Sequence, residues 1–286
     1  PLSNESVTWF FREVMSACLS LERPLAIAFL GPLGTFSESA ATKHFGHAAH
    51  LVPQQSIDDV FREVEACHAD FAVVPIENSV EGGVSATLDA LADGERLMII
   101  REVLLPVQFG LYVRPGTDLA DVRRVLTHPH AAAQTRGWLA ANVPQATVTE
   151  GGSTAAAAAE VANPGSQWDA AVCAAVAGEM YGLVPAASGI ADNEAAVTRF
   201  VLVGHQGAPS ERTGADKTTL VAYMHENRPG ALLEILQQCQ HELEGLAAGL
   251  PWTAANMVES ASRASALATE CITELESTLT SQAATT

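Results

Sequence analysis

The sequence has 286 residues, of which 48% are hydrophobic and 17% are charged, and its formal net charge at pH 7 is −18. The length suits one large domain or two modest ones. The acidic balance excludes nucleic acid as an expected partner, because affinity for it comes largely from clustered lysine and arginine. We also expect no membrane-spanning helix, because no apolar run reaches the roughly 18 residues that one needs.

Residues 5–22 carry apolar side chains at helical spacing, which predicts an amphipathic helix. Residues 25–30 form a short apolar run that is typical of a buried strand, and a glycine-rich turn follows at residues 31–34. Thr35 and Glu38 have the spacing of a capping box, so a helix is expected to begin there. This order of strand, glycine turn and capped helix is typical of the start of an α/β unit. It leaves free N–H groups at the end of the strand, where such folds bind ligands.

The pattern of strand and helix repeats along the chain. Further strands are predicted at residues 50–53, 71–75, 97–104, 107–113, 122–126, 146–149, 170–173 and 197–204, and further helices at residues 56–67, 84–91, 130–141, 155–162 and 174–183. Because strand and helix alternate throughout, the predicted class is α/β. We expect two lobes, with the strand at 107–113 crossing into the second lobe and the strand at 197–204 returning to the first.

The C-terminal part has a different character. Residues 205–216 are rich in glycine, proline and charge, which indicates a linker. A strand is predicted at 217–225 and a helix from about 230 to 240. Residues 241–286 are rich in Ala, Ser, Thr and Glu, and loosely packed helices with a frayed end are expected there.

The five cysteines lack CxxC spacing, which argues against a disulfide framework or a zinc site and favours a reducing cytoplasm. They are Cys18, Cys67, Cys173, Cys239 and Cys271. The N-terminus shows no basic region followed by an apolar core, so a secretory signal is not expected.

Thr198 and Arg199 lie at the start of the predicted strand at 197–204. A hydroxyl and a guanidinium are unfavourable in a hydrophobic core, but both can bind a small anion through hydrogen bonds. The alternative is an ordinary strand start with one exposed arginine. If the strand is regular, neighbouring side chains point in opposite directions, so Arg199 either binds an anion or braces the fold.

Several motifs occur together and in order. They are Gly31-Pro32 with Gly34-Thr35-Phe36-Ser37, Pro75-Ile76-Glu77-Asn78-Ser79 with Gly82 and Thr87-Leu88-Asp89, Thr127-His128-Pro129 with Gln134, Ser153-Thr154-Ala155, and Thr198-Arg199-Phe200. In this combination, residues 26–204 resemble prephenate dehydratase. The resemblance implies a two-lobed domain of the periplasmic-binding-protein type over residues 25–204. It also implies conversion of prephenate into phenylpyruvate, carbon dioxide and water in L-phenylalanine biosynthesis, without a metal or an organic cofactor.

The resemblance points to Thr198 as the catalytic group that assists the departing hydroxyl. Glu77 is the one acid in these loops whose pKa burial could raise, which would make it a second catalytic group; its alternative is a salt bridge. The residues expected to bind substrate are Thr35, Ser37, Asn78, Ser79, Thr127, Gln134, Ser153, Thr154, Arg199 and Phe200. For each serine and threonine the alternative is a helix cap, and for Gln134 it is an ordinary place on a helix surface. His128, before Pro129, is expected to be structural.

Both flanks carry weaker resemblances. Residues 1–24 resemble the last helix of a chorismate mutase domain, but without the earlier helices of that domain no mutase activity is expected. Residues 217–286 resemble a partial α+β ACT regulatory domain, which in this family binds phenylalanine and supports a homodimer or homotetramer. The implied effector residues are Asn227, Pro229, Gly230, Ala231 and Leu232. The family's second regulatory motif, Glu-Ser-Arg-Pro, does not follow, which argues against feedback inhibition by L-phenylalanine.

Two other functions fit the same residues. Arogenate dehydratase acts on a substrate that differs from prephenate only by an amino group. A solute-binding protein shares the arrangement of two α/β lobes around a cleft and would be non-catalytic. The combination of motifs around Thr198 favours the enzyme.

Overall fold

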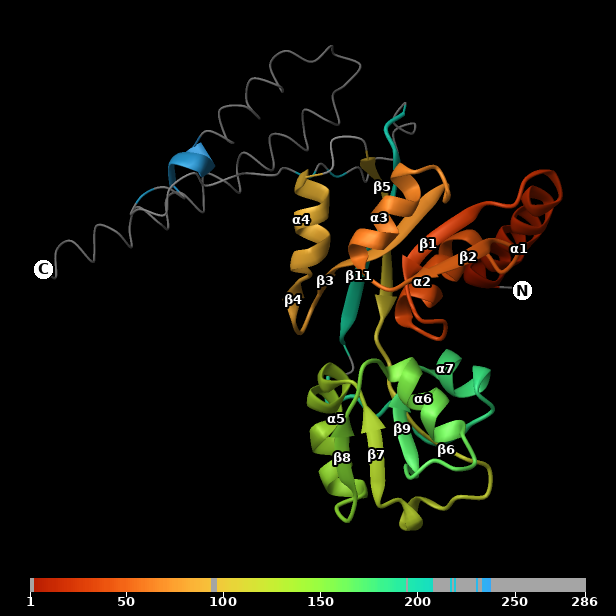
Figure 1. Cartoon of the computed structure of the whole chain (residues 1–286), viewed down its shortest axis with the longest axis vertical. Coiled ribbons are helices and arrows are strands. Elements are labelled where there is room, and N and C mark those ends of the chain that lie inside the picture. The colour runs from red at the N-terminus through yellow and green to blue at the C-terminus, as the bar shows by residue number, and fades with distance from the viewer. Residues whose placement is uncertain are drawn as a thin grey trace, which may run out of the picture. The chain divides into compact units, whose positions relative to one another are not determined.

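The structure, a computed structural model, describes residues 3–93, 97–193 and 195–207, and beyond these only residues 217, 219, 230 and 233–237. The chain divides into two compact units, residues 1–208 and residues 209–286. The first unit contains two separate sheets (Figure 1). Its α/β class and its two lobes confirm the prediction from the sequence.

The first lobe is built on a mixed sheet with the strand order β2-β1-β3-β11-β5, and β4 pairs with β3. Its strands are β1 (Ala26–Leu30), β2 (His50–Gln54), β3 (Phe71–Asn78), β4 (Gly82–Gly83), β5 (Leu97–Pro106) and β11 (Val197–His205), and its helices are α2 (Phe36–Phe45), α3 (Ile57–Glu65) and α4 (Ser85–Asp93). Val60 and Val64 of α3 pack in a core with Val201, whereas Phe200 packs in a second core with residues of β1 and α2.

The second lobe has the strand order β10-β6-β9-β7-β8. Its elements are β6 (Gly110–Val113), the short 3-10 helix η1 (Leu119–Asp121), β7 (Arg124–Thr127), α5 (Pro129–Asn142), β8 (Thr147–Glu150), α6 (Thr154–Ala162), β9 (Ala170–Cys173), α7 (Ala175–Met180) and β10 (Val184–Ser188). Alanines of α6 pack with Tyr112 and Leu183 in one core, and Ala131 and Leu139 of α5 pack with Val125 in another.

The final strand of the unit, β11, lies antiparallel between β3 and β5. The chain therefore leaves the first lobe after β5, builds the second lobe, and returns to the first sheet, as the sequence predicted. Because β11 has a neighbour on each side, both of its edges are paired, and its side chains are held in register with β3 and β5. This placement fixes the position of Thr198, the second residue of β11.

Two sequence predictions in the second lobe were wrong in detail. The strand predicted at 107–113 begins only at Gly110, and the helix predicted to reach residue 183 ends at Met180. The strand β10 that follows was not predicted. It is an edge strand with a register irregularity next to Pro185, and proline and alanine give no strand signal of their own.

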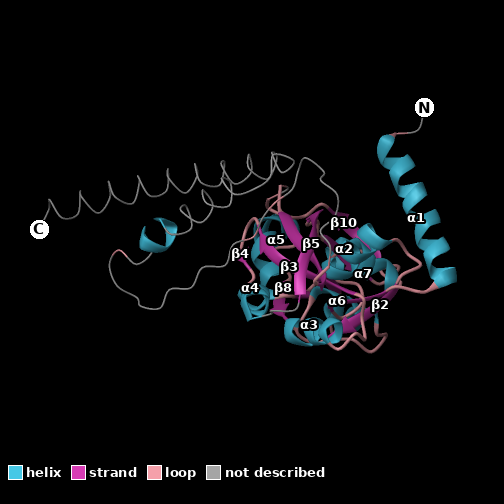
Figure 2. Ribbon diagram, turned by 90° about the horizontal axis from the view of Figure 1, so that it is seen from above, coloured by secondary structure: helices cyan, strands magenta, loops and turns pink. Residues whose placement is uncertain are grey.

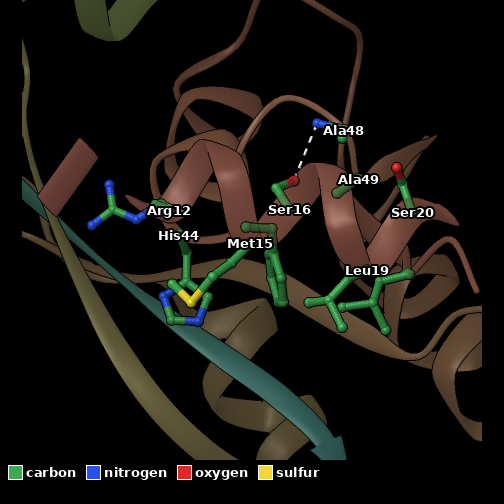
Figure 3. A pocket seen from close by; sticks show the side chains of 10 residues that line it. Arg12, Met15, Ser16, Leu19, Ser20, His44, Ala48 and Ala49 are labelled. Atoms are coloured by element: carbon green, nitrogen blue, oxygen red, sulfur yellow. Dashed lines mark hydrogen bonds between the residues drawn. The ribbon is translucent and has the colours of Figure 1, made fainter. Parts of the chain in front are cut away.

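The helix α1 (Asn4–Glu22) contacts the first lobe along only part of its length. Figure 2 shows it to one side of the two sheets. The backbone N–H of Ala48 donates to Ser16 Oγ over 3.2 Å, and His47 N–H donates to the Glu13 carboxylate over 3.1 Å. A largely apolar hollow lies beside these contacts, with Met15, Leu19 and His44 in its lining (Figure 3).

The described residues of the second unit include a turn at Gly230. Gly230 has φ +87°, its carbonyl accepts a hydrogen bond from Glu234 N–H over 3.1 Å, and residues 233–237 are helical. Four of the predicted effector residues lie outside the described residues, as does most of the predicted strand at 217–225. These four are Asn227, Pro229, Ala231 and Leu232. Among the described residues, none of the helices has both the length and the apolar character needed to cross a membrane.

The packing of α7 on β6 requires a glycine. A Cβ atom added at Gly178 would lie 2.2 Å from Cδ1 of Tyr112, whose ring is buried in the core, so the ring or the helix would have to shift. We expect Gly178→Ala to lower the free energy of unfolding by about 1–3 kcal/mol, measured by urea denaturation. Gly152→Ala is the control, because nothing lies within 4 Å of a Cβ atom there. Equal stability of the two variants would contradict this description of the contact.

Candidate active site

Thr198 lies at the point where β11 enters the first sheet, opposite Asn78 at the end of β3. Asn78 Nδ2 donates a hydrogen bond to Thr198 Oγ1 over 2.8 Å. Next to this pair, Ser79 N–H donates to the carbonyl of Val197, and Val197 N–H donates to Ser79 Oγ, each over 2.9 Å. Ser79 therefore extends the pairing of the two strands by one residue and holds the start of β11 in place.

The orientation of the Asn78 amide follows from its other contacts. Asn78 Oδ1 accepts hydrogen bonds from Val80 N–H over 2.8 Å and from Glu81 N–H over 3.3 Å. The nitrogen must then face Thr198, whose oxygen acts as the acceptor. The hydroxyl hydrogen of Thr198 consequently points away from Asn78, and no hydrogen bond among the described residues uses it. A buried hydroxyl with an engaged oxygen and an unused hydrogen can donate to a ligand.

Arg199 braces the sheet, which is the second of the two roles considered from the sequence. Its guanidinium pairs with Glu77 across the β3–β11 ladder and with Glu102 of β5 over 3.3 Å. Arg199 Nε is buried and has no hydrogen-bond partner among the described residues. Because neighbouring side chains of a strand alternate, Arg199 points to the opposite side from Thr198. Two carboxylates neutralise its charge, so it offers little attraction to a third anion.

Three expectations for individual residues do not fit the structure. Glu77 is exposed and paired with Arg199, so the burial that would have made it a proton donor is absent and the salt-bridge alternative holds. Phe200 is buried in the core of the first lobe, where its ring packs on aliphatic side chains instead of facing a ligand. Thr127 is fully buried, and its hydroxyl donates to the carbonyl of Val172 over 2.8 Å, so it ties β7 to β9.

The first turns of α2 and α6 carry four more of the predicted residues. Thr35 caps α2, with Oγ1 accepting from Glu38 N–H over 3.5 Å, and Ser153 caps α6, with Oγ accepting from Ala156 N–H over 3.0 Å. Ser37 is buried in the first turn of α2, and Thr154 is the first residue of α6. Capping satisfies one N–H group in each helix, and other N–H groups of the first turn still lack an intrahelical partner.

Gly34 brings the starts of these two helices together, although they belong to different lobes. A Cβ atom added at Gly34 would lie 3.3 Å from Cβ of Ala155 in α6 and 3.2 Å from Cβ of Ala177 in α7. With φ +84°, Gly34 also adopts a conformation that other residues rarely take. The positive ends of two helix dipoles are thus close to each other, an arrangement that attracts anions, and the Glu38 carboxylate accepts a hydrogen bond from Gly34 N–H there.

The first half of α5 forms another contact between the lobes. Gln134 is buried, and its Nε2 donates to Glu81 Oε1 over 2.9 Å, while Glu81 Oε2 pairs with His130 Nδ1 over 2.6 Å. His128 caps the helix by accepting from His130 N–H at its Nδ1 over 3.2 Å. Burial, followed by the charge of His130, lowers the pKa of His128. This cap is in keeping with the structural role expected for His128.

Glu81 was not predicted as a site residue. Its partners lie 49 and 53 positions further along the chain in the other lobe, and no local spacing links them. Within the described residues, no group of three or more histidine, cysteine or acidic side chains is arranged to hold a metal ion. The hollow of Figure 3 lies between α1 and α2 and belongs to a different part of the first lobe from Thr198.

The double ion pair of Arg199 leads to a stability prediction. Arg199→Gln leaves two carboxylates without their shared cation, whereas Glu77→Gln leaves Arg199 still paired with Glu102. We expect Arg199→Gln to lower the free energy of unfolding by about 1–2 kcal/mol and Glu77→Gln by less than about 1 kcal/mol, since all three side chains are partly exposed. Urea denaturation at neutral pH measures both. A larger loss from Glu77→Gln would contradict the bracing role of Arg199.

Comparison with known proteins places this arrangement in a family. A family model described as prephenate dehydratase matches residues 27–208. The chain is 44% identical over 237 residues to a bifunctional chorismate mutase/prephenate dehydratase of Stutzerimonas stutzeri, covering 82% of this chain and 63% of that one. It is also 44% identical over 228 residues to the prephenate dehydratase of Mycolicibacterium vanbaalenii, covering 74% of this chain and 72% of that one.

A solved structure is similar as well. The prephenate dehydratase of Arthrobacter aurescens, crystallised in complex with L-Phe, superposes with a TM-score of 0.71 and 48% sequence identity, over 77% of this chain and 73% of that one. The chain thus spans less than two thirds of the bifunctional relative and nearly three quarters of the two monofunctional ones.

Proposed function

The chain belongs to the prephenate dehydratase family, and we propose that it converts prephenate into phenylpyruvate, carbon dioxide and water as a step of L-phenylalanine biosynthesis. The observation that carries the proposal is the Asn78–Thr198 hydrogen bond, which leaves the Thr198 hydroxyl as a directed donor. Family membership supplies the substrate, and the geometry supplies a group that can act on it.

The reaction breaks two bonds to the cyclohexadiene ring. The ring carboxylate leaves as carbon dioxide, the electrons of its bond to the ring enter the ring, and the hydroxyl opposite departs as hydroxide with the electron pair of the C–O bond as the ring becomes aromatic. The departing hydroxide takes up one proton and leaves as water. A threonine hydroxyl is too weak an acid to supply that proton unaided, so Thr198 stabilises the departing oxygen by hydrogen bonding while the proton comes ultimately from solvent.

The two carboxylates of prephenate need a binding site that does not depend on Arg199, whose charge is already shared between two glutamates. The starts of α2 and α6 provide N–H groups and hydroxyls on both sides of the Gly34 contact. We assign the carboxylates to this place, with Thr35, Ser37, Ser153 and Thr154 as the surrounding residues. Helix N-termini bind anions without any formal charge of their own, which is consistent with a protein of net charge −18.

L-Phenylalanine is proposed as a second ligand. The Arthrobacter relative was crystallised with it, and residue 230 of this chain takes the glycine conformation with φ +87° ahead of a short helix. The absent Glu-Ser-Arg-Pro motif argues for weaker binding. Titration with L-phenylalanine during the prephenate assay measures this directly, and the same samples in a sedimentation experiment report the oligomeric state.

Substitution of Thr198 tests the catalytic assignment. Thr198→Ala removes the hydroxyl and is expected to lower kcat on the order of 10²–10⁴-fold, with KM and thermal stability close to the wild type. Thr198→Ser keeps the hydroxyl but loses the methyl group that restricts its rotamers, so part of the activity should remain. Phenylpyruvate formation followed by absorbance gives both rates. Near-normal turnover by Thr198→Ala would refute the assignment.

The choice of substrate needs its own assay. The wild-type protein is incubated with prephenate and, separately, with arogenate, and phenylpyruvate or phenylalanine is followed. Faster turnover of prephenate is the expected result. Faster turnover of arogenate would reassign the substrate, and binding of prephenate by calorimetry without turnover would identify a binding protein.

A further inference from the structure

Glu81 lies in the turn between β3 and β4 of the first lobe and reaches across to α5 of the second. Its two carboxylate oxygens have different partners: Oε1 accepts from Gln134 Nε2 over 2.9 Å, and Oε2 lies 2.6 Å from His130 Nδ1. His130 and Gln134 are four residues apart on one helix, so they lie on the same face. One carboxylate thus holds two neighbouring side chains of the opposite lobe.

The carboxylate fixes the orientation of the Gln134 amide. A carboxylate only accepts hydrogen bonds, so the nitrogen of the amide must face Glu81 and Oε1 must face elsewhere. Gln134 is 92% buried, and its Oε1 is buried and has no hydrogen-bond partner among the described residues. A buried acceptor without a partner is costly, and a donor on a ligand would satisfy it. The hydroxyl of the proposed substrate is such a donor.

The backbone of Glu81 acts on the other amide of the site. Its N–H donates to Asn78 Oδ1, together with the N–H of Val80, and this turns Asn78 Nδ2 toward Thr198. The same residue therefore contacts both side-chain amides, Asn78 through its main chain and Gln134 through its side chain. Glu81 therefore connects the amide of Asn78 in the first lobe to the amide of Gln134 in the second.

We propose that Glu81 is a positioning residue for the dehydration, which holds the Gln134 amide in its working orientation and links that orientation to the Asn78–Thr198 pair. The inference rests on the proposed function, because its rate test measures turnover of prephenate. The side chain of Glu81 is not needed for folding, because a partly exposed ion pair contributes little to stability. Loss of the carboxylate releases the amide of Gln134 and leaves the Asn78 contact, which is made by the backbone, intact.

The chain offers a matched control. Glu63 pairs with His68 on α3 and the turn after it, with exposed side-chain fractions of 30% and 69%, compared with 32% and 63% for Glu81 and His130. Both pairs join a glutamate to a histidine at similar exposure, and Glu63 contacts no residue of the site. Glu63→Ala therefore removes a comparable charge without affecting either amide.

The rate test uses Glu81→Ala, Glu81→Gln and Glu63→Ala in the full chain. Glu81→Ala should lower kcat for prephenate about 10- to 100-fold, as a misplaced binding group does. Glu81→Gln keeps an acceptor oxygen and should recover most of that loss. Glu63→Ala should stay within about twofold of the wild type, and all three should keep the wild-type melting temperature within a few degrees. An effect of Glu81→Ala below about twofold, or an equal loss in Glu63→Ala, would overturn the proposal.

A double-mutant cycle shows whether Glu81 acts through Gln134. In a Gln134→Ala background, Glu81→Ala should change kcat by less than about threefold, because the amide that it positions is gone. If the two losses multiply, the carboxylate acts in some other way and the proposal fails.

A spectroscopic readout separates this inference from the proposed function. The side-chain amide resonance of Gln134, assigned by its disappearance in Gln134→Ala, should move in the spectrum of Glu81→Ala and stay in place in Glu63→Ala. If the wild type does not consume prephenate, the proposed function fails, and the resonance still decides the role of Glu81. An amide resonance that does not move in Glu81→Ala would refute the positioning role.

Discussion

The hydrogen bond from Asn78 Nδ2 to Thr198 Oγ1 determines what this site can do. A free threonine hydroxyl rotates and can donate in several directions. Once its oxygen accepts from an amide whose own oxygen is held by two backbone N–H groups, its hydrogen is turned away from that amide and can donate to another group. A weak acid thereby becomes a directed donor, and pre-orientation of this kind spares the reaction the cost of arranging the group at each turnover.

The fold is arranged to keep that hydrogen bond in place. Asn78 and Thr198 are 120 positions apart, and they meet because β11 returns from the second lobe to lie between β3 and β5. Ser79 fixes the register at the entry of the strand, and Arg199, on the opposite side from Thr198, ties it to the strands on both sides. The contacts of Gly34 and Glu81 join the lobes at two separate places. The ends of α2 and α6, where we propose that the substrate carboxylates bind, are thus brought together by the two folded lobes.

The sequence predicted what local chemistry determines. The caps at Thr35 and Ser153 follow from spacing alone, and the returning strand follows from its apolar run and the alternation of elements. The directions in which Thr198 and Arg199 point depend on partners 97 to 122 positions away in the sequence. No local pattern contains those partners. For the same reason Glu81 was missed, and the choice between a buried acid and a salt bridge at Glu77 stayed open until its partner Arg199 was known.

The most direct test of the account is the substitution Asn78→Asp. It keeps the size of the side chain but replaces the amide nitrogen, a donor, with an oxygen that can only accept, so the Thr198 hydroxyl would turn its hydrogen toward the new carboxylate. We expect kcat for prephenate to fall close to the value of Thr198→Ala, about 10²-fold or more below the wild type, while the melting temperature changes little. A variant that keeps most of the wild-type kcat would show that the direction of the Thr198 hydroxyl does not matter, and would contradict the central claim.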